Sequence, residues 1–216
     1  LKQLNQIIWY IFNDKHTHAI AITTVGKTKT DFTFNYTINQ TTKSNEYDLY
    51  LDFGPTILSH NTKQLKRTLK TIAADIESMA LYGNRMRYCV FDLRETLGGH
   101  FYIVWPMLYT YIIENCTNTT NKTPLRALVS HNTASMGEYI AATIETDLGG
   151  IVYGTSSKTA GACTHNSWFD VDGIVRLSIT TNEFYTPLRK IKYNVKHVYC
   201  KYTCEDLSCL LGTWDI

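Results

Sequence analysis

Ser135 is the first residue of this sequence whose type and setting could do chemistry. It lies in the segment SHNTASMGEYIAA, residues 130–142, where a predicted strand ends and a predicted helix begins. A serine at such a junction exposes its hydroxyl and directs the N–H groups of its neighbours outward, which suits a nucleophile. The same pattern fits a helix N-cap, where serine and threonine are favoured. On the local pattern alone, the N-cap is the stronger interpretation.

Two adjacent glycines, Gly98 and Gly99, could stabilise a developing negative charge. They end the segment FDLRETLGG, residues 91–99, between a predicted buried strand and a predicted helix. Glycine lets the backbone approach a ligand closely, and N–H groups at the start of a helix suit an oxyanion. Glycines also occur in strand–helix turns for steric reasons alone, so the pair by itself is a weak signal.

A general base could come from the segment NDKHTHA, residues 13–19, which contains His16 and His18. A histidine at the entrance of a strand can accept a proton near neutral pH. Two residues apart on a strand, both histidines would share a face, so the pattern does not separate them. The small-residue segment GTSSKTAGA, residues 154–162, is either a loop that lines the site or a turn.

Hydrophobic periodicity predicts the elements that must position these segments. From residue 61 to residue 154 helices alternate with strands, which is typical of α/β layering. The predicted helices cover 61–81, 101–114 and 136–145, and the predicted strands cover 87–93, 125–129 and 150–154. Before them we expect a helix or buried strand over 4–12, strands over 19–25 and 47–53, and a hairpin or exposed connection over 26–48. A hairpin over 170–180 follows, with Asp172 and Gly173 as its turn.

The composition of the 216 residues excludes several classes of protein. Hydrophobic residues make up 44% and charged residues 19%, which is an ordinary globular balance. The net charge of +2 and the scattered basic residues give no indication of nucleic-acid binding. The longest apolar runs, such as 101–107, are too short for a membrane span, and residues 1–6 lack the pattern of a secretory signal. The start at a leucine suggests a mature product or an excised fragment.

Cysteines and glycosylation sequons favour an oxidising compartment. The cysteines are Cys89, Cys116, Cys163, Cys200, Cys204 and Cys209, and the N-x-[ST] sequons begin at Asn35, Asn39, Asn115, Asn118 and Asn121. The C-terminal C-x3-C-x4-C pattern lacks the C-x2-C pairs of structural zinc sites, so we expect disulfides rather than a metal, with the pairing open. The expectation is a secreted or extracellular glycoprotein. The alternative is a composition rich in Asn and Thr that produces sequons by chance.

Taken in order, these segments resemble the tail-specific, or C-terminal-processing, serine peptidases. That family also includes the tricorn-type proteases and the interphotoreceptor retinoid-binding proteins. Its D-x-H-T, D-L-R-x-N-x-G-G and T-A-S-x-x-E elements are matched by residues 14–17, 92–99 and 133–138. Its later elements, an aspartate, V-x-G-x-x-T-x-G and T-T-x-x-Y-Y-T-P, are matched by Asp147, by 152–161 and by 180–187. The resemblance covers residues 4–192, nearly the whole chain.

The resemblance is closer to the tricorn and retinoid-binding branch than to the branch with a Ser–Lys dyad. The dyad lysine belongs to a G-x-x-x-x-G-K-G element, and Ala160 stands at its position here, in TAGA. TAGGA is the form of the tricorn and retinoid-binding branch, whose peptidases use serine with a histidine and a carboxylate. Lys158, two residues away, leaves a shifted lysine base as an alternative.

The resemblance implies a crotonase/ClpP-like layered β-α core with an N-terminal strand and helix region and a Cys-rich C-terminal tail. The implied division is 1–60 for the part that carries the base histidine, 61–192 for the catalytic core and 193–216 for the tail. No peptide-recognition (PDZ) insert is visible between the histidine element and the core.

The implied activity is that of a serine endopeptidase. Ser135 would attack a peptide carbonyl after giving its proton to His16, and an acyl-enzyme would form. The N–H groups of Met136 and of Gly98 or Gly99 would hold the oxyanion. The expected partner is a protein or peptide substrate, with no cofactor, metal or nucleic acid, and a homo-oligomer stays open.

The carboxylate that should orient His16 has no clean motif in this chain. Glu205 is the first candidate and Glu183 the alternative. The gap keeps a second hypothesis open, a catalytically inactive relative that binds a hydrophobic ligand or a protein partner. A third is a cytosolic Ser–Lys peptidase that uses Lys158.

Three charged or titratable residues near these segments are expected to have structural roles. Glu138 fits a favourable charge in the first turn of a helix. His100 and His131 flank the glycine pair and the serine, and we expect both to be structural.

Overall fold

The computed structural model describes residues 2–12, 18–21, 33–43, 45–55, 61–117, 122–154, 159–160, 165–172, 175–182, 184–185, 192–193 and 202–203. The helices are α1 (Lys2–Phe12), α2 (Thr62–Leu81), α3 (Phe101–Leu108), the π-helix η1 (Tyr109–Ile113), α4 (Glu114–Thr117) and α5 (Met136–Thr146). The first six strands are β1 (His18–Ala21), β2 (Asn35–Gln40), β3 (Glu46–Asp52), β4 (Arg85–Asp92), β5 (Leu125–Val129) and β6 (Ile151–Gly154). The later strands are β7 (His165–Val171), β8 (Val175–Asn182), β9 (Phe184–Tyr185), β10 (Lys192–Tyr193) and β11 (Tyr202–Thr203).

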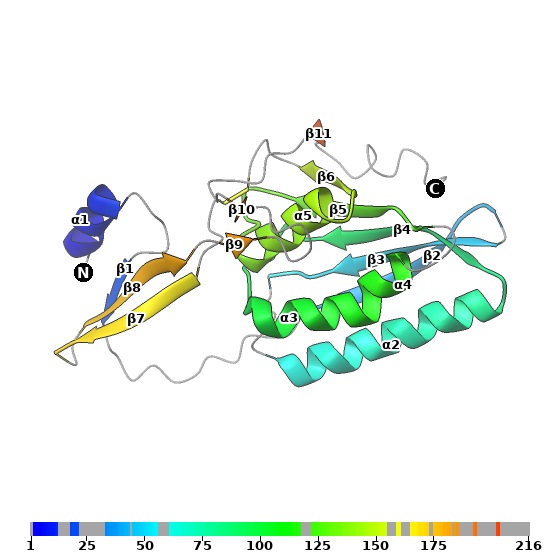
Figure 1. Ribbon diagram of the computed structural model, residues 1–216, viewed down its shortest axis with the longest axis horizontal. Coiled ribbons are helices and arrows are strands. Elements are labelled where there is room, and N and C mark those ends of the chain that lie inside the picture. The colour runs from blue at the N-terminus through cyan, green and yellow to red at the C-terminus, as the bar shows by residue number, and fades with distance from the viewer. Residues whose placement is uncertain are drawn as a thin grey trace.

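A six-stranded sheet in the order β11-β6-β5-β4-β3-β2 forms the centre of the molecule (Figure 1). Strands β3, β4, β5, β6 and β11 pair in parallel, and β2 pairs antiparallel with β3 at the edge. Helix α2 connects β3 to β4, the α3–α4 helix connects β4 to β5, and α5 connects β5 to β6. The predicted alternation of helices and strands is therefore confirmed, and it produces the parallel sheet expected of such an order.

The main hydrophobic core lies between the helices and one face of this sheet. Strand side chains such as Leu49, Leu51 and Phe91 are fully buried against Leu65 and Leu69 of α2. Successive strand side chains point to opposite faces, so this face takes every second residue. Burial of each such side chain contributes about 1.5–3 kcal/mol, which is enough to orient the strands and the helices together.

The opposite face of the sheet has a smaller cluster. Val90 and Leu128 are buried there, with Tyr50, Tyr88 and Tyr153 packed against them. Both faces therefore carry apolar side chains, as is usual for parallel strands.

The segment before β3 forms a hairpin, the first of the two structures expected for it. Strands β2 and β3 pair from Asn35–Asp52 to Gln40–Tyr47 without a break in register. The N-terminal apolar segment is a helix, α1, rather than a strand. The division of the chain into residues 1–60, 61–192 and 193–216 stays a prediction.

A second, three-stranded sheet has the order β1-β8-β7 (Figure 1). The predicted hairpin is confirmed, because β7 and β8 pair antiparallel up to Val171–Val175 and Asp172 has the positive φ of 51° that suits a tight turn. Within the described ranges, every helix is too short or too polar to span a bilayer.

Candidate active site

Ser135 has a backbone conformation that few serines adopt. It lies between β5 and α5, with φ 51° and ψ −112°. Among the described residues, Asp172 is the one other non-glycine residue with positive φ, and its hairpin turn accounts for that. A non-glycine residue held in such a region costs about 1–3 kcal/mol, and such residues cluster at active sites. The strained strand-to-helix turn is the setting in which an exposed nucleophilic serine is found.

Glu138 holds the turn from inside the protein. Its side chain is fully buried, one carboxylate oxygen accepts the Ser135 N–H at 3.0 Å, and the other accepts the Thr159 hydroxyl at 2.5 Å. Its position in the first turn of α5 was expected, and the helix dipole favours a negative charge there. The structure adds its burial and its two hydrogen bonds, which tie the serine backbone to the segment after β6.

Gly98 brings its backbone directly against the Ser135 side chain. A Cβ atom added to Gly98 would lie 2.8 Å from Ser135 Cβ, 3.2 Å from Ser135 Oγ and 3.5 Å from the Met136 nitrogen. Gly98 also has φ of 121°, which L side chains rarely adopt. Both the space and the conformation therefore require glycine here, and the predicted glycine and serine segments meet in space.

Hydrogen bonds between the two loops hold this meeting point. The Thr133 hydroxyl donates to the Leu93 carbonyl at 2.8 Å, and the Ala134 N–H donates to the Thr96 carbonyl at 3.0 Å. These loops follow β5 and β4, which are parallel neighbours, so both leave the same edge of the sheet. The carboxyl ends of parallel strands are where ligands bind in α/β sheets.

The end of β4 is fixed by the Asp92–Arg94 pair. The Arg94 guanidinium donates two hydrogen bonds to the buried Asp92 carboxylate, at 2.9 and 2.6 Å, and the Tyr50 hydroxyl donates to the same carboxylate. The hydrogen bond to Asp92 raises the pKa of Arg94, and burial raises the pKa of Tyr50. Ser130 donates its hydroxyl to the Arg94 carbonyl, which connects this cluster to the serine loop. Asp92, Leu93 and Arg94 thus position the two loops through these contacts.

The position two residues after the serine is also tightly packed, which sequence reasoning missed. A Cβ on Gly137 would lie 3.1 Å from the Thr133 methyl and 3.2 Å from Thr96 Cβ. The Thr96 hydroxyl is the one buried side-chain polar atom without a partner in the part of the chain that the structure describes. In the sequence, Gly137 in the first turn of a predicted helix was the sign that this position is tightly packed, because glycine is otherwise unfavourable within a helix.

Several predicted site residues lie outside the described residues. These are His16, Lys158, Glu183 and Glu205. His18 begins β1 and pairs with Ser178 of β8, while His100 and His131 are exposed. The described part of the chain contains no group of three or more His, Cys, Asp or Glu residues that could hold a metal ion.

No family model and no curated protein matches the chain at the level of sequence. Solved structures do match. A Parabacteroides merdae protein assigned as a peptidase has a TM-score of 0.58 at 10% identity, covering 100% of this chain and 82% of its own. The photosystem II D1 C-terminal processing protease has a TM-score of 0.54 at 17% identity, covering 88% and 54%. A lipoprotein from Streptococcus agalactiae has a TM-score of 0.57 at 15% identity, covering 99% and 79%.

The chain has the fold of the S41 peptidases. A Bacteroides fragilis protein assigned to the S41 proteases agrees, with a TM-score of 0.53 at 13% identity over 83% of this chain and 52% of its own. The predicted α/β layered core is therefore confirmed. The chain spans about half the length of this protein and of the D1 protease.

Proposed function

We propose that this chain is a serine-type peptidase with Ser135 as its nucleophile. The observation that carries the proposal is the strained Ser135 backbone with the Gly98 backbone packed against its side chain. Ser135 is also the N-cap residue of α5 and forms a capping box with Glu138. Capping alone needs neither feature, because N-cap residues normally have extended backbone. The S41 peptidase fold supports the same reaction class, and peptide bonds are the corresponding substrate.

In the proposed mechanism, Ser135 Oγ attacks the peptide carbonyl while His16 takes the hydroxyl proton. The N–H groups of Met136 and of Gly98 or Gly99 hold the oxyanion, and loss of one such donor costs about 3–4 kcal/mol of barrier. The C–N bond then breaks as His16 returns the proton to the leaving amine. Water hydrolyses the resulting acyl-enzyme and regenerates the serine.

We assign the base to His16 rather than to a lysine because of Ala160. The Ala160 N–H donates to the Thr133 carbonyl at 3.0 Å, two residues before the serine. The position of the dyad lysine in the related branch thus adjoins the serine loop, and here it carries only a methyl group. A tricorn-like arrangement, with Glu205 or else Glu183 orienting the histidine, fits this substitution.

The test is labelling by a fluorophosphonate probe, which reacts with activated serines. We expect wild type to be labelled, and Ser135→Ala and His16→Ala to lose labelling. His131→Ala, which changes an exposed histidine beside the serine loop, is the matched control and should label normally. Labelling that persists in His16→Ala but is lost in Lys158→Ala would replace the histidine by a shifted lysine. An unlabelled, folded wild type would contradict the peptidase proposal.

Ala160 and the missing carboxylate motif also favour a second candidate, an inactive relative that binds a hydrophobic ligand or a protein partner. This candidate predicts no labelling together with saturable quenching of Trp or Tyr emission by an apolar ligand. Labelling of wild type would exclude it.

We also propose that the protein is secreted and glycosylated. Two sequon asparagines in the described residues, Asn35 on β2 and Asn115 on α4, are exposed. An enzymatic deglycosylation that lowers the apparent mass of protein from a secreting host would support this. A mass equal to that of the bare chain would contradict it.

A further inference from the structure

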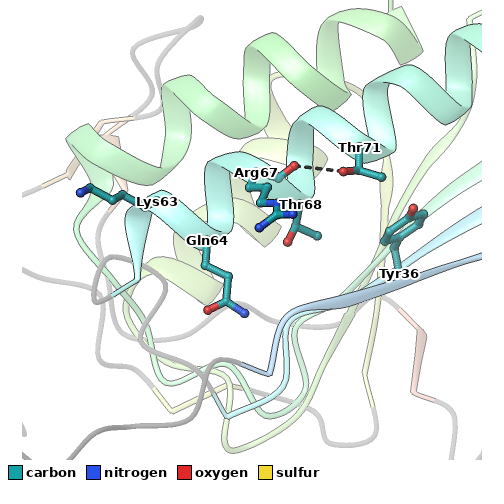
Figure 2. Close-up of a pocket in the computed structure, with 6 residues that line it drawn as sticks. All are labelled: Tyr36, Lys63, Gln64, Arg67, Thr68 and Thr71. Carbon is teal, nitrogen blue, oxygen red and sulfur yellow. Dashed lines mark hydrogen bonds between the residues drawn. The ribbon is translucent and has the colours of Figure 1, made fainter.

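A groove runs between the edge strand β2 and the N-terminal half of α2 (Figure 2). Its volume is about 570 Å³. It is lined by Tyr36, Lys63, Gln64, Arg67, Thr68 and Thr71. All except Tyr36 come from one side of α2, where positions 63 and 64, 67 and 68, and 71 lie on three successive turns. The groove lies on different elements from the Ser135 site.

The lining of the groove is positively charged. Lys63 and Arg67 are both exposed, and neither forms an ion pair with a described residue. The six lining residues include no acidic one; the nearby Asp75, one turn after Thr71, accepts a hydrogen bond from the Tyr36 hydroxyl at 2.6 Å. The first turn of α2 contains no acidic residue either. Lys63 lies in the first turn of α2, where a cation is unfavourable because the N-terminus of a helix carries partial positive charge. An anionic ligand would offset this repulsion and the repulsion between Lys63 and Arg67.

The floor of the groove is the outer edge of the sheet at β2. In the part of the chain that the structure describes, β2 pairs with β3 alone. The Thr41 N–H donates to the Glu46 carbonyl, just beyond the Gln40–Tyr47 pair. Since such bonding alternates along an antiparallel pair, the backbone groups of Tyr36, Ile38 and Gln40 face outward. An exposed edge of this kind accepts an extended peptide as an additional strand.

We propose that this groove binds an extended acidic peptide segment, which pairs with β2 and directs carboxylates toward Lys63 and Arg67. The two cations lie four residues apart on the helix, a rise of about 6 Å. Two side chains on the same face of a strand, at positions i and i+2, are about 6.7 Å apart. Acidic residues at alternate positions therefore match the spacing of the two cations.

The rest of β2 is compatible with such a ligand. Tyr36 and Ile38 pack toward the helices, so alternation places the sequon asparagines Asn35 and Asn39 on the other face. Glycans there would leave the groove open. The proposal concerns binding alone and holds whether or not Ser135 is a nucleophile.

The test measures binding of a fluorescein-labelled octapeptide with glutamates at positions i and i+2 among valines and threonines. The protein carries Ser135→Ala, so that cleavage cannot interfere. We expect saturable binding by anisotropy. Lys63→Gln with Arg67→Gln should weaken it about tenfold at low salt, the combined effect of two exposed ion pairs. Lys66→Gln with Lys70→Gln removes the same charge from the same helix outside the groove and should bind as the parent does.

Two further measurements separate strand pairing from general attraction between charges. Amide exchange at Tyr36, Ile38 and Gln40 should slow when the peptide is bound, and a peptide N-methylated at alternate residues should bind at least about tenfold more weakly. A peptide of the same composition with its glutamates at i and i+3 should also bind less well. The proposal would be overturned if the N-methylated or i, i+3 peptide bound as tightly as the i, i+2 peptide. It would also be overturned if the two double variants lost the same amount of affinity for that peptide.

Discussion

Gly98→Ala tests the contact on which the candidate site depends. The new methyl group would lie 2.8 Å from Ser135 Cβ, closer than real Cβ atoms come. It would also occupy a backbone region, φ 121°, that alanine rarely adopts. We expect the unfolding free energy to fall by about 1–2 kcal/mol because of the backbone conformation and by a further 1–3 kcal/mol because of overpacking. The turn and the serine must move apart, so the rate of fluorophosphonate labelling should fall about 100- to 1,000-fold.

Gly83→Ala is the matched control for this substitution. Gly83 ends α2 with φ of 78°, and a Cβ there meets nothing within 4 Å. In this variant only the backbone conformation should lower the unfolding free energy, by about 1–2 kcal/mol, and the labelling rate should equal that of wild type. The assay is urea unfolding together with labelling rates. If Gly98→Ala were as stable as Gly83→Ala and labelled at the wild-type rate, the close packing of Gly98 on Ser135 would be refuted.

Three other predictions test the surroundings of the site and the core. Glu138→Ala should lower the unfolding free energy by about 2–4 kcal/mol and slow labelling, because the buried Thr159 hydroxyl and the part-buried Ser135 N–H lose their acceptor; a stability within 0.5 kcal/mol of wild type would contradict this. Arg87→Ala should cost about 3–5 kcal/mol in the same assay, because the buried Asp48 carboxylate loses contacts at 3.0 and 2.6 Å, and Arg87→Lys should recover part of it. Burial raises the pKa of the Cys89 thiol, so the folded state keeps a proton that the unfolded thiol releases above about pH 8.5. Stability should therefore fall between pH 8 and 10, and Cys89→Ala should reduce that slope; an unchanged slope would count against the burial of this thiol.

Cys89 and Cys116 also qualify the expectation of disulfides. Both are free and fully buried, and the Cys116 thiol contacts the Met86 sulfur at 3.9 Å. The other four cysteines lie outside the described residues, so a disulfide within the C-terminal tail stays a prediction.

The sequence was sufficient for elements whose stability comes from local pattern. Helix α2 was predicted from Leu65, Leu69, Ile72 and Ile76, and these are its buried residues. Strand β5 was predicted with its observed bounds, because a short apolar run bounded by polar residues suits a buried parallel strand. The order of helices and strands then led to the layered α/β core, since parallel strands need helical crossovers.

The site was predicted only as separate segments. The sequence suggested Ser135, Gly98 and Met136 through a family resemblance of several short motifs in order, whereas the local pattern around the serine favoured an N-cap. The positive φ of Ser135 and the absence of space beside Gly98 depend on two loops that meet at the edge of the sheet. Such contacts form between residues far apart in the chain, so no local propensity encodes them.

The groove beside α2 and the buried Glu138 likewise depend on tertiary structure rather than on local sequence. The basic residues of α2 are visible in the sequence, but the basic residues of the chain as a whole are scattered and did not indicate a binding site. Tertiary structure decided that Lys63 and Arg67 lie beside the outer edge of β2, because β2 folds back on β3 and no other described strand pairs with it. Likewise, Glu138 could be read as a charge at a helix start, while its burial followed from packing of α5 against the rest of the core. Periodicity and turn chemistry are properties of neighbouring residues, whereas a site is a property of surfaces that folding brings together.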